Sequence, residues 1–215
     1  MPNHVETKMW LLSQDGSQLS SKQVEDFFSQ FISIDTHARD CEEARIFDFN
    51  LIIPQPDNIW PGNVGGLPEN NILNIEKYGG IDAVKKAIKD RAYFEPNDLC
   101  LTEDQVKQFG LVNGLDWNRK YWETKWGAYD CHFDWDGDKG DAHVYFYTAW
   151  TVPEKIIRLI REIALKQGFD VRCEFGGELD DLGVYEDGLF MYWETEWNDA
   201  TGDYERKGDP VDVHK

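Results

Sequence analysis

The stretch YDCHFDW, Tyr129 to Trp135, carries the strongest fold signal in this chain. Its side chains alternate between two classes: Tyr129, Cys131, Phe133 and Trp135 against Asp130, His132 and Asp134. This period of two is typical of a β-strand with one apolar and one polar face. The aromatic segment from Ala142 to Trp150 predicts the returning strand of a hairpin, because only a short loop, Asp136 to Gly140, lies between.

Helix signals stand on both sides of this hairpin. Ser20-x-x-Gln23 is a capping-box pattern before an amphipathic run, and Thr102-x-x-Gln105 and Thr151-x-x-Glu154 repeat it. Ile81 to Arg91 also has helical spacing of its apolar residues. Further strands are predicted at His4 to Leu12, Phe47 to Ile53, Phe169 to Phe175 and Val184 to Trp197.

The order of these elements predicts an α+β fold. A strand, a helix, an insertion, the hairpin, a helix and a strand follow one another, which resembles a split β-α-β arrangement with helices on one face of an antiparallel sheet. We expect a single domain over residues 1–215, with an insertion at about 54–116 and acidic C-terminal strands at about 170–215.

Composition indicates a globular protein with an acidic surface. The chain has 215 residues, nine Trp, nine Tyr and twelve Phe, and a net charge of −19. Between Asp170 and Lys215 lie 14 acidic and 4 basic residues. Such a field repels phosphate backbones and favours basic proteins, so direct nucleic-acid binding is disfavoured. Isolated cysteines and the lack of a long apolar run predict free thiols and a cytoplasmic location, with no membrane partner.

The hairpin tip has three interpretations. Asp134, Asp136 and Asp138 match the first three ligand positions of an EF-hand calcium loop. Lys139 stands where the turn glycine belongs and Tyr145 where the bidentate glutamate belongs, which speaks against calcium. A solvated loop and an acidic contact surface remain.

The acidic contact surface is the first candidate site. Its residues are carboxylates of the hairpin tip and the C-terminal strands: Asp134, Asp136, Asp138, Asp141, Asp180, Asp181, Glu186, Asp187, Glu194 and Glu196. Carboxylates on a rigid sheet can imitate the phosphates of DNA and occupy a basic groove. The alternative is that they only keep an aromatic-rich protein in solution.

The second candidate site is a lysine among tryptophans. In YWETKWGAYD, Trp122 and Trp126 surround Lys125, and Trp150 approaches after folding. Such a cluster binds an anion or stacks a nucleobase. The alternative is a tryptophan-rich core layer from which Lys125 extends to solvent.

Enzyme motifs are absent from the sequence: it has no nucleophile elbow, phosphate loop, dinucleotide fingerprint or zinc-protease motif. His132 and His143 on the hairpin strands are the residual catalytic or metal candidates. In a register that closes near Asp138, His132 lies opposite Val144, so His143 points to the other face. We therefore expect a non-enzymatic protein without metal or cofactor.

Four stretches resemble a family of ferredoxin-like proteins of phages and mobile elements that includes the plasmid protein YubB. They are Met1-Pro2-Asn3 with the strand that follows, Phe49 to Pro56, Thr124-Lys125-Trp126 with Trp122 upstream, and Thr148-Ala149-Trp150 before Pro153. The resemblance implies a ferredoxin-like sheet with an inserted helical segment, and it implies no catalytic residues. Glu123 and Val152 depart from the family pattern, which has Gly and Pro there.

Together these features predict an accessory protein of a phage or mobile element that acts in the host bacterial cytoplasm. It is expected to bind a basic host protein through its acidic surface and to inhibit a nucleic-acid-binding defence factor as a DNA mimic. The alternative is a small-ligand or nucleotide-binding module at the Trp and Lys cluster.

Overall fold

The computed structural model of the chain describes residues 3–34, 45–65, 75–90, 100–134, 142–177, 182–200 and 203–212. It has a mixed α+β fold that divides into two compact units. The larger unit comprises Met1–Ile53 and Tyr121–Lys215, and the smaller comprises Pro54–Lys120, where the sequence predicts an insertion at about 54–116.

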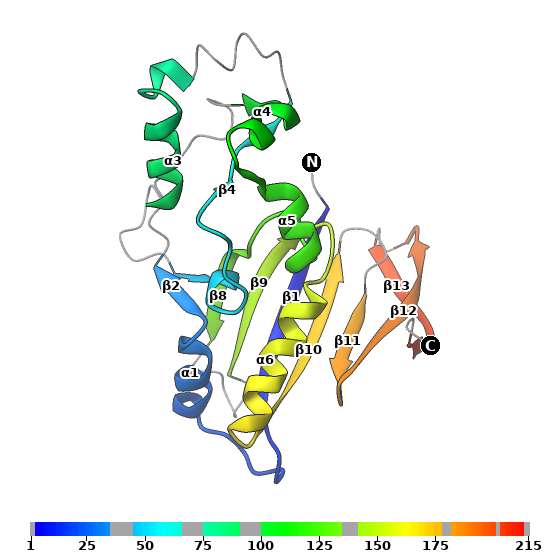
Figure 1. Cartoon of the computed structure of the whole chain (residues 1–215). Coiled ribbons are helices and arrows are strands. Elements are labelled where there is room, and N and C mark those ends of the chain that lie inside the picture. The colour runs from blue at the N-terminus through cyan, green and yellow to red at the C-terminus, as the bar shows by residue number, and fades with distance from the viewer. Residues whose placement is uncertain are drawn as a thin grey trace. The chain divides into compact units, whose positions relative to one another are not determined.

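A seven-stranded sheet forms the frame of the larger unit. Its strands are β1 (His4–Ser13), β8 (Tyr129–Asp134), β9 (His143–Ala149), β10 (Phe169–Gly177), β11 (Gly183–Glu186), β12 (Leu189–Asn198) and β13 (Asp203–Val211). They lie in the order β13-β12-β11-β10-β1-β9-β8, and every neighbouring pair is antiparallel (Figure 1). The predicted α+β class and antiparallel sheet are thereby confirmed.

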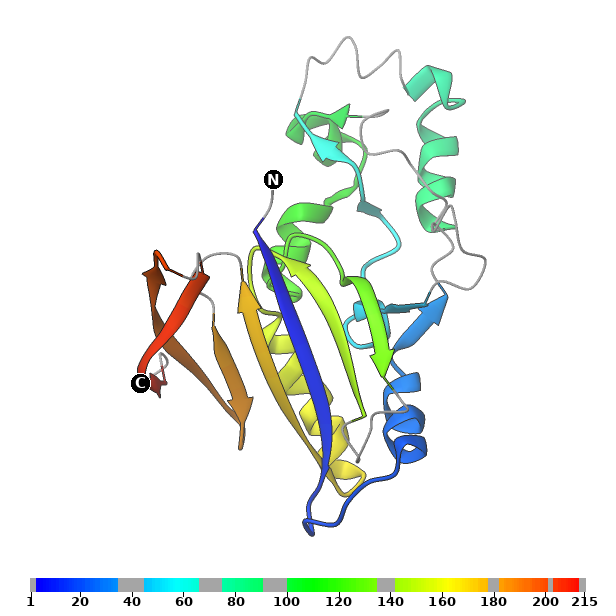
Figure 2. The ribbon, with the colours of Figure 1, turned by 180° about the vertical axis from the view of Figure 1, so that it is seen from behind.

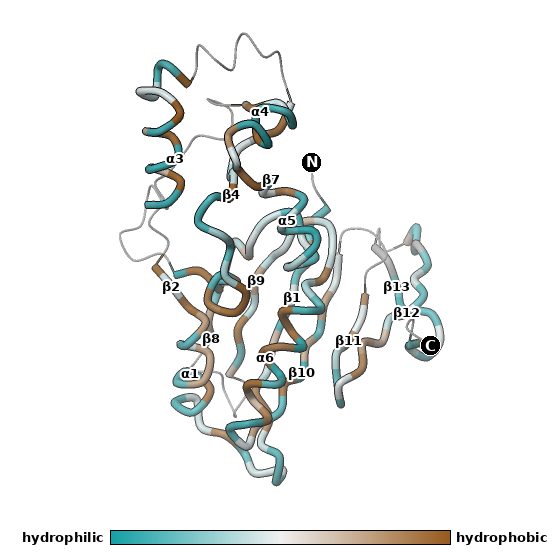
Figure 3. The backbone as a smooth tube through the Cα atoms, in the orientation of Figure 1, coloured by the Kyte–Doolittle hydropathy of each residue, from teal (hydrophilic) through white to brown (hydrophobic). Residues whose placement is uncertain are grey.

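Two helices, α1 (Ser21–Ser29) and α6 (Glu154–Lys166), lie on one side of this sheet. Figure 1 shows α6 in front of the strands, and Figure 2, seen from behind, shows the strands in front of α6. Helix α1 begins with the predicted capping box: Gln23 N donates to the Ser20 hydroxyl at 3.3 Å, and Ser20 N donates to the Gln23 side chain at 3.0 Å. Helix α6 alternates apolar and polar segments around its axis (Figure 3), as expected for a helix with one buried face.

The core lies between the sheet and these helices. On the sheet side it contains alternate residues of three strands: Val5, Met9, Leu11, Val144, Phe146, Val171, Cys173 and Phe175. The helices contribute Val24, Phe27, Phe28, Ile156, Ile157, Ile160 and Ala164. The rings of Phe146 and Phe47 stack at 4.9 Å between centroids, so aromatic packing supplies much of this core.

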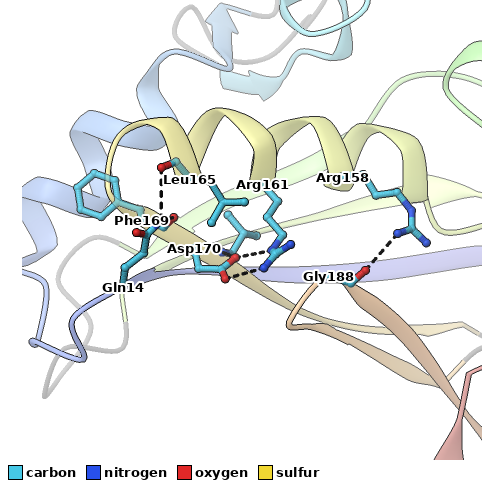
Figure 4. Close-up of polar contacts among 8 residues, drawn as sticks. Gln14, Arg158, Arg161, Leu165, Phe169, Asp170 and Gly188 are labelled. Atoms are coloured by element: carbon cyan, nitrogen blue, oxygen red, sulfur yellow. Dashed lines mark hydrogen bonds and ion pairs between the residues drawn. The ribbon is translucent and has the colours of Figure 1, made fainter.

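Polar contacts fix α6 on the sheet (Figure 4). The Arg161 guanidinium donates two hydrogen bonds to Asp170 at the start of β10, Nε to Oδ1 at 2.6 Å and Nη2 to Oδ2 at 2.9 Å. Arg158 Nη1 donates to the Gly188 carbonyl at 3.2 Å, in the turn between β11 and β12. At the other end of the helix, Gln14 donates to the carbonyl groups of Leu165 and Phe169.

Short elements surround a separate core in the smaller unit. They are β4 (Ile59–Trp60), β5 (Asn63–Val64), α3 (Ile81–Lys89), β6 (Cys100–Leu101), α4 (Glu103–Gln108), β7 (Val112–Asn113) and α5 (Gly114–Tyr121). Trp60 is fully buried in a cluster with Val84, Leu101 and Val106. The predicted capping box of Thr102 and Gln105 opens α4.

Two local predictions are wrong. The segment from Phe47 to Ile53 is not one strand, because β3 (Arg45–Phe47), paired with β2 (Ile32–Ile34), ends at Phe47 and a 3₁₀ turn, η1 (Phe49–Leu51), follows. Thr151 does not cap α6 either. The N-cap is Pro153, and the Glu123 carboxylate accepts a hydrogen bond from Lys155 N at 2.9 Å, so a distant segment does the capping.

Among the described residues, no helix is long and apolar enough to cross a membrane.

Candidate functional site

The face of the sheet opposite α1 and α6 carries a second set of ordered side chains. Residues that pair directly across strands point to the same face, so the pairing register groups them into three rows. The rows, which we call the open face, are Tyr129, Tyr147, Glu6 and Gly176; His132, Tyr145, Lys8 and Glu174; and Asp134, His143, Trp10 and Arg172. In Figure 2 no helix of this unit lies in front of these strands.

Aromatic side chains dominate the half of the open face formed by β8, β9 and β1. The His132 and Tyr145 rings stack at 4.7 Å between centroids with an interplanar angle of 13°. The Trp10 ring stacks on His143 at 5.4 Å, and the Tyr129 ring stacks on Tyr147 at 6.2 Å with an interplanar angle of 29°. Half-buried stacked rings hold one another in fixed orientations, which lowers the entropy lost when a ligand covers them.

The cations of the open face are already paired. Lys8 Nζ lies 3.1 Å from Glu6 Oε1. The Arg172 guanidinium contacts Glu174 at 2.5 Å and Glu186 at 3.5 Å. Both cations are therefore neutralised locally, and the open face offers no surplus of positive charge to a phosphate group.

A hydrogen bond between Tyr147 and Glu6 fixes the first row. The Tyr147 hydroxyl donates to Glu6 Oε2 at 2.7 Å, which raises the pKa of Tyr147 to about 12. Burial raises the pKa of Glu6, but the hydrogen bonds from Tyr147 and Lys8 outweigh it, and the pKa falls below its ordinary value. Glu6 is therefore a stable carboxylate among aromatic rings.

A tryptophan clamp, formed by Lys125, Trp126 and Trp150, adjoins the first row. Lys125 Nζ lies 4.7 Å from the centroid of the Trp126 ring and 4.7 Å from that of the Trp150 ring. This is cation–π geometry on two rings. The clamp reaches the open face through Trp126, whose ring is 6.3 Å from that of Tyr129.

Two segments distant in sequence meet at the clamp. Lys125 N donates to the Ala149 carbonyl at 3.2 Å, and Trp150 N donates to the Asn3 carbonyl at 2.8 Å. The stretches Thr124-Lys125-Trp126 and Thr148-Ala149-Trp150, which carry the family resemblance, are thus side by side.

Backbone strain gathers at the same place. Among the described residues, four that are not glycine have positive φ, and three of them adjoin the clamp: Glu123 at 65°, Trp150 at 82° and Asp130 at 47°. Such a conformation costs about 1–3 kcal/mol per residue and persists only where the surrounding structure enforces it. A bulky side chain such as that of Trp150 is especially unusual there. Strain of this kind marks the clamp as a candidate binding element.

The clamp contains three of the four residues predicted for the aromatic site. Trp122 lies elsewhere: it is 3% exposed, packs edge-on against Phe49 at 5.7 Å, and donates its indole N–H to the Ile53 carbonyl at 3.0 Å. Trp122 is a core residue, and Trp150 supplies the second ring beside Lys125.

The structure describes five of the ten acidic residues predicted as a contact surface, and these five lie on different strands and a turn of the sheet. Asp136, Asp138, Asp141, Asp180 and Asp181 lie outside the described residues. Asp134 is in β8 at one edge of the sheet, and Glu194 and Glu196 are exposed in β12 near the other edge.

Of the remaining two, Asp187 forms the turn between β11 and β12, whereas Glu186, at the end of β11, lies beside Arg172. A register shift separates Tyr192, which contacts Glu154 of α6, from Glu194 and Glu196, which pair with Lys207 and Glu205 of β13.

The predicted hairpin register is wrong by one residue. His132 pairs with Tyr145 and not with Val144, and Asp134 pairs with His143. His132 and His143 consequently lie on the same face in neighbouring rows, because a slip of one residue turns every side chain of a strand to the other face. Each imidazole stacks on a ring.

No group of three or more metal-ligating side chains occurs within the described ranges.

Sequence reasoning missed Trp10, Tyr145 and Tyr147 as site residues. The signal was present in His143 to Thr148, where the apolar Val144 and Phe146 alternate with rings and not with charged groups. A strand with aromatic residues on both faces indicates a second contact surface besides the core.

Comparison with known proteins gives no relative: neither a protein-family model, a curated protein nor a solved structure matches this chain.

Proposed function

We propose that this chain is a non-enzymatic binding protein that holds a basic protein partner on its open face. The observation that carries the proposal is the three rows of ordered aromatic side chains, which no helix among the described residues of the larger unit covers. Protein interfaces are enriched in Tyr, Trp and Arg at their centres, and these residue types dominate binding energies. Here they occupy the strands β1 and β9 and their neighbours.

Charge favours a protein over a nucleic acid as the proposed partner. The open face carries Glu6, Glu174 and Asp134 against Lys8 and Arg172, both paired, and the whole chain has a net charge of −19. Phosphate backbones are repelled by such a field, whereas lysine- and arginine-rich surfaces are attracted and steered to it. A basic protein is therefore the favoured partner.

The fold of the larger unit supports a ferredoxin-like core as part of this proposal. The elements β1, α1, β8, β9, α6 and β10 follow the β-α-β-β-α-β order, and their four strands are adjacent in the sheet. Strands β11 to β13 extend that core at one edge.

The biological role remains the one suggested by the sequence. We propose an accessory protein of a phage or mobile element that occupies the basic groove of a nucleic-acid-binding defence factor in the host cytoplasm. The family resemblance and the acidic net charge support it, and the open face supplies a contact surface. The ordered rings of the open face support a proposed interface centred on the aromatic rows, in place of one centred on the acidic C-terminal strands.

Variants of the two surfaces test the proposal. The purified chain is used to capture proteins from host lysate at low and high salt, beside the variants Trp10→Ala with Tyr145→Ala and Glu194→Gln with Glu196→Gln. We expect a basic protein that is released by salt, lost with the aromatic pair and retained with the glutamine pair. Loss with the glutamine pair alone would place the interface on β12 and overturn the proposal.

A second candidate function is a site for a small anionic aromatic ligand at the clamp. It is favoured by Lys125 between Trp126 and Trp150, with the Trp126 side chain 38% exposed. A nucleotide at 100 times its dissociation constant stabilises its protein by about 2.7 kcal/mol. Thermal-shift measurements with nucleotides, repeated with Lys125→Met, would detect this, and no shift with any nucleotide rejects the candidate.

A further inference from the structure

We infer that the open face binds an extended segment of its partner, with arginines four residues apart set against Asp130 and Asp134. The inference rests on the proposed function and specifies its ligand. Two observations carry it: the contacts of Arg172 on the open face, and the spacing of the three rows.

Arg172 shows how the open face holds a guanidinium. Its guanidinium carbon lies 5.3 Å from the centroid of the Trp10 ring, and its nitrogens contact Glu174 at 2.5 Å and Glu186 at 3.5 Å. An aromatic ring against the guanidinium and carboxylates at its edge provide the two interactions that a guanidinium favours, stacking and forked hydrogen bonding.

The β8 side of the open face repeats these components. Tyr129 with Tyr147 and His132 with Tyr145 form stacked ring pairs, and the exposed carboxylates Asp130 and Asp134 stand beside them. Asp130 is near enough to Tyr147 to raise that phenol's pKa. Within the described part of the chain, neither aspartate takes part in an ion pair. The β8 side of the open face therefore has the rings and the carboxylates, and the guanidinium groups come from the partner.

Row spacing defines the conformation of the partner. Successive rows are two residues apart along a strand, about 6.8 Å, which is also the distance between alternate side chains of an extended chain. Asp134 belongs to the third row, and Asp130 follows Tyr129 of the first row, at the irregularity of β8. The first and third rows are about 13 to 14 Å apart by the same repeat. Two arginines at positions i and i+4 of an extended segment match this distance. The side chain at i+2 then covers the ring pair of His132 and Tyr145.

A helical segment fits the rows less well. Residues four apart on a helix are about 6 Å apart and rotate by about 40° around its axis, so three of them cannot lie flat on three rows.

Two peptides of the same composition test the inference. The first, Ser-Arg-Thr-Tyr-Thr-Arg-Ser, has the predicted spacing, and the second, Ser-Thr-Arg-Arg-Tyr-Thr-Ser, has adjacent arginines. Fluorescence anisotropy with the full chain at low salt is expected to show about tenfold tighter binding of the first, which corresponds to about 1.4 kcal/mol. Equal affinity would falsify the spacing, and so would failure of both peptides to bind.

The control is the double variant Asp130→Asn with Asp134→Asn, compared with Asp187→Asn in the distant β11–β12 turn. Asparagine tolerates positive φ, so the backbone at Asp130 is retained. The double variant should lose the preference for the first peptide, and Asp187→Asn should keep it. A double variant that keeps the preference overturns the inference.

Failure of this inference and failure of the proposed function are distinguishable. Capture of a basic protein that depends on Trp10 and Tyr145, with no effect of peptide spacing, removes only the extended arginine segment.

Discussion

The two faces of one sheet differ in their surroundings: one packs against helices, and the other carries the proposed contact surface. Along β9, the residues Val144 and Phe146 are fully buried under the helices, whereas His143, Tyr145 and Tyr147 between them are half-buried on the open face. The covered face gains free energy by removing apolar surface from water. The open face keeps its rings half-buried, so substitutions on the two faces should separate folding from the proposed binding.

The largest expected effect comes from consecutive residues of β9. Phe146→Ala removes a fully buried ring that stacks on Phe47 and should lower the free energy of unfolding by about 3–5 kcal/mol. Tyr145→Ala, on the open face, should cost about 1 kcal/mol or less. Urea denaturation of both variants measures the difference. Similar losses of unfolding free energy in the two variants would mean that the open face is also packed against other parts of the chain.

An intermediate effect is expected at the ion pair of Arg161 and Asp170 on the covered side. Burial raises the pKa of Asp170, but Arg161 outweighs it and lowers the pKa below its ordinary value of 3.8. Because the folded pKa is lowered, this pair stabilises above pH 3.8, and its contribution disappears as the pH falls through the folded pKa.

Asp170→Asn should therefore cost about 1–2 kcal/mol at pH 7, since both side chains are only 22% exposed. Denaturation from pH 7 to pH 2 should show wild type and variant converging at the acid end. A difference that does not change with pH would assign the loss to packing and not to charge.

The smallest effect is expected at Tyr147 on the open face. Its hydrogen bond to Glu6, with burial and the charge of Glu6, raises its pKa from 10.0 to about 12. Because the folded pKa is raised, this contribution is complete below pH 10 and is lost as the pH rises through about 12.

Tyr147→Phe should reduce stability at pH 7 by about 1 kcal/mol or less. When tyrosine ionisation is followed by absorbance, this variant should lack the one ionisation near pH 12. The control variant Tyr145→Phe should retain it. Ionisation of Tyr147 near pH 10 would show that the bond to Glu6 is weak in solution.

Local chemistry made much of the fold predictable. The capping boxes at Ser20 and Thr102 involve residues three apart, so the helices α1 and α4 follow from the sequence alone. The alternation at Tyr129 and its successors likewise gives strand β8, and the return through His143 gives β9. The α+β class follows from the order of these elements.

The candidate site needed information that no local pattern contains. The register between β8 and β9 includes an irregularity between Tyr129 and His132, and it turns His132 and His143 to the same face. Trp150, and not Trp122, frames Lys125 with Trp126, because the segment after β9 folds back onto the one before β8.

The sequence by itself thus determined the amphipathic elements and the charge of this protein, since both depend on neighbouring residues and composition. Only the tertiary structure decided which aromatic side chains share a face, because that depends on strand pairing between residues far apart along the chain. The acidic residues were visible in the sequence, but the positions of Asp134, Glu194 and Glu196 near opposite edges of the sheet were not.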